Sequence, residues 1–185
     1  MLPHETSVSP KQAKTQEPIK SLEQPGQSTT LTQQRAHQLL NQKDYIGTIN
    51  LIQNEILKGA DEQAFAKEYL QAANSSLIQA DTLANQGYYS KSALLLRTVQ
   101  DSYPKSSELQ QQITSTPAQI AEKIDLCTEE LMEAGLVAYR SGEFSAAIDV
   151  WTQVLELNPR HQAAQNSIQT TQLQLSNLKT LDSKE

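Results

Sequence analysis

The sequence has few of the residues on which metal, disulfide and phosphate sites depend. Among its 185 residues there are one Cys, three His and six Gly. A single cysteine excludes a disulfide framework and a cysteine-based zinc knuckle, and the glycines form no glycine-rich phosphate loop. His4, His37 and His161 share no spacing typical of metal ligands. We therefore expect no metal and no cofactor.

Positive charge and long apolar runs are also scarce. The chain has 15 Lys and Arg against 21 Asp and Glu, which gives a formal net charge of -6. Such an acidic chain repels a phosphate backbone. Apolar runs such as Ala93 to Leu96 fall far short of the roughly twenty residues that a membrane helix needs. We expect neither nucleic-acid binding nor direct membrane insertion.

The positions of the prolines divide the chain. Four of the 7 prolines lie at or before Pro25, and the next one is Pro104. Residues 1–28 are also poor in large apolar side chains, so they cannot bury enough surface to offset the entropy lost on ordering. We predict a disordered tail over 1–28, one helical repeat domain over 29–181 and a disordered end over 182–185.

The repeat domain is predicted to be all-α, because no stretch alternates polar and apolar residues for long enough to form a strand. Helix starts are indicated by side chains that cap backbone amides. Thr30 with Gln33, and Thr116 with Gln119, fit the capping box, and Asp61 is a third candidate cap.

Two long helices are predicted over 62–86 and 117–141, ended by Gly87 and Gly142. Each carries a stripe of small and branched residues at alternating spacings of four and three. The stripes are Ala66, Leu70, Ala73, Leu77, Ala80 and Ala84 in the first helix, and Ile120, Ile124, Cys127, Leu131, Ala134 and Ala138 in the second. Such stripes let another helix approach closely. We interpret Cys127 as a buried small hydrophobic residue rather than a nucleophile.

Residues 128–161 carry the strongest pattern. Gly135 and Ala147 are small where two helices would cross, Trp151 fills the space beside them, and Pro159 ends the second helix. This span resembles a tetratricopeptide (TPR) repeat. The positions that match the TPR pattern are Leu131, Ala134, Gly135, Ala147, Trp151 and Pro159.

Weaker copies of the same pattern occur at about 29–60 and 73–106. They are spaced more widely than the roughly 34 residues of a standard TPR, and the long helices and a linker near Lys105 to Thr116 take up the excess. The resemblance implies a short right-handed stack of helical hairpins. Residues 162–180 would form a polar capping helix that closes the stack.

The resemblance also implies a groove that holds a partner segment. Its lining would be Met132, Leu136, Tyr139 and Arg140 in the third repeat, Leu77, Asp81, Ala84 and Asn85 in the second, and Gln33, His37, Leu40 and Asn41 in the first. This mixed surface suits an extended peptide or a helix. Alternatively, the long helices bury part of it against each other. Positions that clamp a carboxylate in some TPR proteins carry Glu129 and Glu133 here, so a carboxylate ligand is not expected.

One long helix also carries an acidic stripe, formed by Glu122, Asp125, Glu129 and Glu133. It is either a docking face for a basic peptide or an ordinary solvated helix face. Nothing in the sequence supplies the closed site that would make two of these carboxylates an acid–base pair, so we expect no enzyme.

The leading hypothesis is a non-catalytic scaffold or adaptor that binds a protein or peptide. A self-associating structural protein, such as a homodimer formed through the long helices, is the first alternative. The start at Met1 shows no apolar export segment, which predicts a cytoplasmic location. However, the polar, Pro-rich tail resembles the spacer of bacterial envelope lipoproteins, so an upstream start would predict a periplasmic, cell-envelope assembly factor.

Overall fold

The structure is a computed structural model that describes residues 25–182, with side chains over 29–178, and every regular element in that range is a helix. The elements are α1 (Pro25–Asn41), α2 (Tyr45–Leu57), a 3-10 turn η1 (Glu62–Phe65), α3 (Ala66–Asn85), α4 (Tyr89–Asp101), α5 (Ser107–Gln110), α6 (Pro117–Arg140), α7 (Phe144–Leu157) and α8 (Gln162–Asp182). The predicted all-α class is confirmed.

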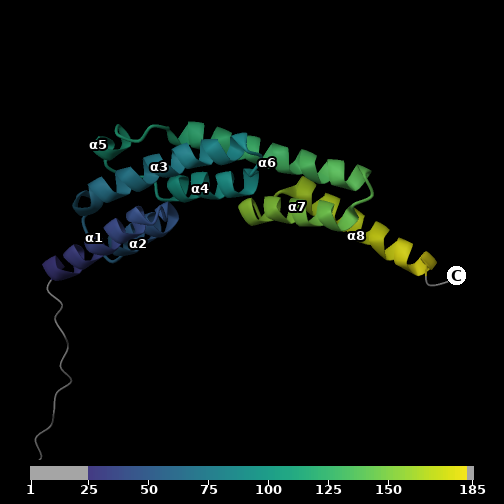
Figure 1. Ribbon diagram of the computed structural model, residues 1–185, viewed down its shortest axis with the longest axis horizontal. Coiled ribbons are helices and arrows are strands. Elements are labelled where there is room, and N and C mark those ends of the chain that lie inside the picture. Colours follow the sequence, from purple (N-terminus) through teal and green to yellow (C-terminus); the bar gives the residue numbers. More distant parts are fainter. Residues whose placement is uncertain (1–24, 183–185) are drawn as a thin grey trace, which may run out of the picture.

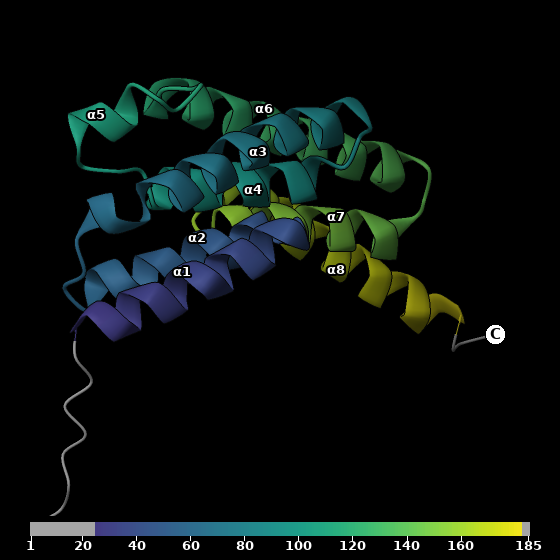
Figure 2. The same cartoon turned by 60° about the vertical axis from the view of Figure 1, so that its left-hand side comes forward.

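Each helix packs mainly against its neighbours along the chain. The pairs α1–α2, α3–α4 and α6–α7 are joined by short turns, α2 packs on α3, α4 packs on α6, and α7 packs on α8. Figures 1 and 2 show α1 and α2 at one end of this stack and α8 at the other. No helix in the described range is both long and apolar enough to cross a bilayer.

In each of the three helix pairs, the two helices are joined by an equivalent turn. Lys43, Gly87 and Gly142 each lie two residues beyond a helix end and have φ values of 58°, 79° and 80°. The next amide then bonds back to the preceding helix. These bonds run from Asp44 N to Leu39 O, from Tyr88 N to Leu83 O and from Glu143 N to Ala138 O, each 2.9 Å long. Such a left-handed residue with its return bond closes a helix end, so α1, α3 and α6 end in the same way.

Small residues occupy equivalent positions in the three helix pairs. They are Ala36 with Thr48, Ala80 with Ser92, and Gly135 with Ala147, and all six are buried. In the middle pair, the hydroxyl of Ser92 donates to the carbonyl of Ala80 at 2.8 Å. The small side chains of Ala80 and Ser92 let α3 and α4 approach closely at this contact.

One predicted helix start is confirmed, one is displaced and one is wrong. Thr116 and Gln119 form the capping box at α6, with Pro117 as the first helical residue. Asp61 accepts from the amide of Gln63 at 3.1 Å, but it caps η1, and the long helix α3 begins only at Ala66. Thr30, however, lies inside α1, which already begins at Pro25.

The start of α1 also corrects the predicted domain boundary, because Pro25 to Ser28 were assigned to the tail. A proline suits the first helical turn, where its fixed φ fits and its missing amide costs no hydrogen bond. Most of the predicted tail, residues 1–24, and residues 183–185 lie outside the described part of the chain. The predicted capping helix corresponds to α8, and α5 interrupts the predicted linker.

The stripe on α6 needs one correction. Ile120, Ile124, Cys127 and Leu131 are buried, but Ala134 is exposed and Gly135 is buried in its place. The side chain of Trp151 on α7 covers Gly135, so the buried face of α6 runs through position 135.

Candidate functional site

The structure divides the predicted groove residues among separate places. Leu77 on α3 is only 2% exposed and Leu40 on α1 is 7% exposed, so both belong to the hydrophobic core and the prediction that they line a groove is wrong. The reason is that α3 packs against α1, α2 and α4, which leaves this face of α3 no access to solvent.

The predicted groove residues of α1 mostly tie that helix to the next hairpin. His37 is half-exposed, and its Nε2 lies 2.9 Å from Oε1 of Glu68, a buried residue on α3. Gln33 donates to the carbonyl of Ala64 at 2.8 Å. Asn41 is exposed at the end of α1. These contacts give His37 and Gln33 a structural role between α1 and the second hairpin.

Met132 and Leu136, in contrast, line an opening. This α6–α8 cleft has a volume of about 290 Å³, and its lining includes Trp151 of α7 and Ser167 of α8. Its remaining lining residues are Thr128, Glu129, Glu133 and His161. The cleft therefore has an apolar wall on α6 and two carboxylates on the same helix.

A smaller cleft of about 250 Å³ adjoins the α6–α8 cleft and shares Thr128, Glu129 and His161 with it. Asp125 and Arg97 also line it. Arg97 is held in place because its guanidinium donates to the carbonyl of Leu157 at 2.6 Å.

The other two predicted groove residues of α6 lie beyond the α6–α8 cleft. The ring of Tyr139 packs edge-on against Phe144 at 5.4 Å between centroids, and its hydroxyl bonds to Gln174 of α8. Tyr139 therefore joins three helices instead of facing a ligand. Arg140 is exposed, with a guanidinium nitrogen 3.9 Å from a carboxylate oxygen of Glu133.

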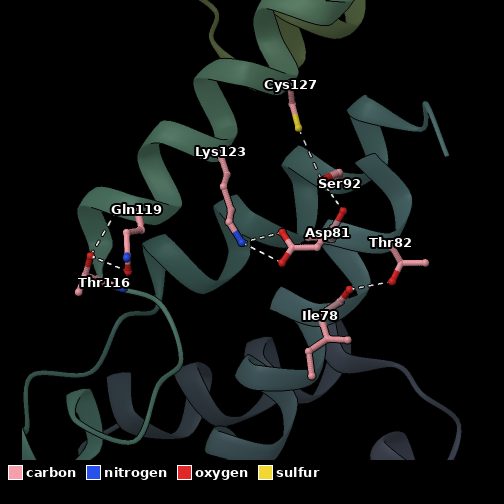
Figure 3. Close-up of polar contacts among 9 residues, drawn as sticks. Ile78, Asp81, Thr82, Ser92, Thr116, Gln119, Lys123 and Cys127 are labelled. Carbon is pink, nitrogen blue, oxygen red and sulfur yellow. Dashed lines mark hydrogen bonds and ion pairs between the residues drawn. The ribbon is translucent and has the colours of Figure 1, made fainter. Parts of the chain in front are cut away.

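Asp81, Ala84 and Asn85 line a different and larger opening, the α3–α6 cleft, with a volume of about 740 Å³. Its other walls come from Tyr89, Ser92 and Leu96 of α4 and from Lys123, Leu126, Cys127 and Glu130 of α6. Figure 3 shows Lys123 reaching across to Asp81 and Cys127 pointing toward Ser92. The ammonium of Lys123 lies 2.6 and 2.9 Å from the two carboxylate oxygens of Asp81.

The lining of the α3–α6 cleft includes two carboxylates, Asp81 and Glu130. The negative charge of Glu130 is the main cause of a raised pKa at Tyr89. Burial raises the pKa of the Cys127 thiol, Ser92 lowers it, and the charges of Glu130 and Asp81 raise it further. The thiol is buried and lies 3.6 Å from the hydroxyl of Ser92. Cys127 is thus the buried small residue that the sequence predicted, in a site that disfavours its nucleophilic thiolate.

Sequence reasoning did not single out Lys123, Tyr89 or Glu130. They come from two helices, and the residue that Lys123 binds lies 42 positions away. For Lys123 and Glu130, the sequence offered one signal, which is that polar residues flank the predicted stripe of α6.

The predicted acidic stripe lies on the surface: Glu122, Asp125, Glu129 and Glu133 are all exposed. Two large apolar side chains of α6 are exposed beside it, Leu126 at 55% and Val137 at 54%. Within residues 25–182 no three His, Cys, Asp or Glu side chains gather as ligands of a metal ion would.

No protein-family model matches the sequence, and no curated protein is significantly similar to it.

Proposed function

We propose that this protein is a non-catalytic interaction scaffold that holds a basic, amphipathic segment of a partner protein on α6. The three hairpins would be TPR-like repeats, with α8 as the closing helix. The equivalent turns at Lys43, Gly87 and Gly142 support this repeat assignment.

One observation carries the proposal, namely the outer face of α6. Glu122, Leu126, Glu129, Glu133 and Val137 follow one another at spacings of four, three, four and four residues, so they share one helix face. That face spans about 22 Å at a rise of 1.5 Å per residue. It exposes two large apolar side chains between three carboxylates.

The chemistry of the outer face of α6 indicates the chemistry of its partner. Exposed leucine and valine gain from contact with apolar side chains, and the carboxylates favour lysine or arginine beside them. The α6–α8 cleft borders this face and offers Met132 and Leu136 as a further apolar contact. A helix with apolar residues on one side and basic residues at its edges fits these requirements.

The test compares capture of partners by two variants of the full chain. Leu126→Lys with Val137→Lys adds positive charge to the outer face of α6, which repels a basic segment, and both side chains are exposed, so folding should be retained. Leu57→Lys is the matched control, because Leu57 is 81% exposed and lies on α2, which is not among the helices that pack principally on α6. Both variants and the parent would be used to capture proteins from lysate, with circular dichroism as a check of helix content.

We expect a captured partner to be lost with the α6 variant and kept with Leu57→Lys. Its binding should weaken as salt rises, since exposed charges are screened. Capture that is equal for all three proteins would contradict the proposal.

Self-association is a second candidate, favoured by the exposed leucines of α8. Leu173 is 65% exposed and Leu178 is 43% exposed, and α8 packs only on α7 among the principal helix contacts. Sedimentation of the full chain tests this candidate. A dimer that dissociates in Leu173→Lys with Leu178→Lys would support it, and a monomer at all concentrations would contradict it.

A further inference from the structure

The α3–α6 cleft exists because α6 packs along α4 and leaves a gap beside α3. Across this gap the ammonium of Lys123 binds both oxygens of Asp81. The pair is partly exposed, with side-chain exposures of 34% and 54%, and such surface pairs contribute little to stability. The cleft is therefore bridged by a contact that a ligand can displace at small cost.

The charges that line the α3–α6 cleft do not balance. Lys123 and Asp81 neutralise each other, and Glu130 adds a second carboxylate that forms no ion pair within the described part of the chain. Glu130 is exposed and close enough to Tyr89 for its charge to act on the phenol. The cleft therefore carries a net negative charge beside a hydroxyl group.

The cleft also has apolar wall residues, beside the polar Asn85 and Ser92. Leu96 is 1% exposed, Ala84 is half-buried, and Leu126 is exposed. A side chain with a methylene stem and a cationic end matches such a site, because its stem packs on apolar walls while its end meets a carboxylate. Lysine and arginine have this build, and an acidic side chain does not.

We propose that the α3–α6 cleft binds a lysine or arginine side chain of the partner segment, with the cationic end at Glu130 and the stem along Leu96 and Leu126. This inference rests on the proposed function and adds to it by naming the kind of residue that enters the cleft. Asp81 contributes a second carboxylate when Lys123 moves aside.

The experiment is a titration of the ¹⁵N-labelled full chain by NMR, with N-acetyl-L-arginine amide as the probe. N-acetyl-L-glutamine amide, which has a similar stem but no charge, is the neutral control. We expect the arginine probe to shift the amide signals of Asp81, Tyr89 and Glu130, with affinity on the order of millimolar, as is usual for a single small contact group. The glutamine probe should leave them in place.

Three variants sharpen this result. Glu130→Gln should weaken probe binding about tenfold, because it removes the charge that the probe meets. Lys123→Met should tighten binding by a similar factor, because it frees Asp81. Asp125→Asn is the matched control. Asp125 lies on the same helix and is exposed, but it lines a different cleft. Removing its charge should therefore leave probe binding unchanged.

The inference would be overturned if the shifts were absent, if the glutamine probe also caused them, or if Glu130→Gln bound the arginine probe with unchanged affinity. The two proposals fail separately. If capture of a partner depends on Leu126 and Val137 but the arginine probe does not bind, the proposed function is supported and this inference is contradicted. If the arginine probe binds but no partner is captured, the cationic site is supported and the scaffold function is contradicted.

Discussion

The indole of Trp151 on α7 lies directly against the backbone of Gly135 on α6. A Cβ atom at position 135 would be 2.2 Å from the indole Nε1 and 2.6 Å from Cδ1. The same indole N–H donates to the carbonyl of Met132, one helical turn earlier, at 3.2 Å. The crossing of α6 and α7 therefore requires both the missing side chain of Gly135 and the large ring of Trp151.

The first prediction is that Gly135→Ala destabilises the fold. Forcing a methyl group against a rigid ring costs about 1–3 kcal/mol. Replacing glycine by alanine in a helix gains up to about 1 kcal/mol, so the net result should be a loss of stability. Urea unfolding followed by circular dichroism measures the net loss. In a Trp151→Leu background the same substitution should be neutral or stabilising, since the ring is gone. An equal loss in both backgrounds would show that the ring is not the cause.

The second prediction concerns Lys43. Its φ of 58° lies in the left-handed region, which favours glycine, and the two equivalent turns have glycine at this position. The left-handed conformation costs a residue with a Cβ roughly 1–2 kcal/mol, so Lys43→Gly should stabilise the protein by up to about 1 kcal/mol after the entropy cost of glycine. Gly87→Ala is the opposite test, because no atom lies within 4 Å of its added Cβ and the cost comes from φ alone. Thermal unfolding of both variants should show shifts of opposite sign.

The local signals of the sequence predicted much of this fold because they act within a few residues. The capping box at Thr116 and the glycine turns depend only on groups within a few residues along the chain. The candidate site was harder to predict because it depends on how α6 is placed. Leu77 proved to be buried, and Asp81, one helical turn later, faces the α3–α6 cleft. Periodicity alone does not say which neighbour covers each face.

The third prediction is that His37 supports a buried carboxylate. The side chain of Glu68 is 7% exposed and its oxygen accepts from His37 Nε2 at 2.9 Å. His37→Ala should cost about 1–3 kcal/mol, which is typical when a buried acceptor loses its partner. Glu68→Gln should cost less, because the amide removes the buried charge and keeps an acceptor. Urea unfolding compares the variants, and a larger loss in Glu68→Gln than in His37→Ala would contradict this role.

The fourth prediction follows from Tyr69, a buried residue whose hydroxyl donates to the carbonyl of Ser102 at 2.8 Å. Burial, more than the nearby Glu62 and Tyr103, raises its pKa from 10.0 to about 12, although the bond to Ser102 acts in the opposite direction. The folded protein therefore holds this proton at pH values where the unfolded chain has lost it. The stabilisation is complete below pH 10 and is lost as the pH rises from about 10 to about 12.

The slope over that window should be about 1.4 kcal/mol per pH unit, or on the order of 2–3 kcal/mol in total. The free energy of unfolding in urea, measured at pH 8, 9.5, 11 and 12, tests this for the parent and for Tyr69→Phe. The variant should lose about 1 kcal/mol at pH 8 with its hydrogen bond, yet decline less steeply above pH 10. It keeps a smaller slope, since the pKa of Tyr103 is also raised by burial. An equally steep decline in both proteins would assign the alkaline loss to other groups.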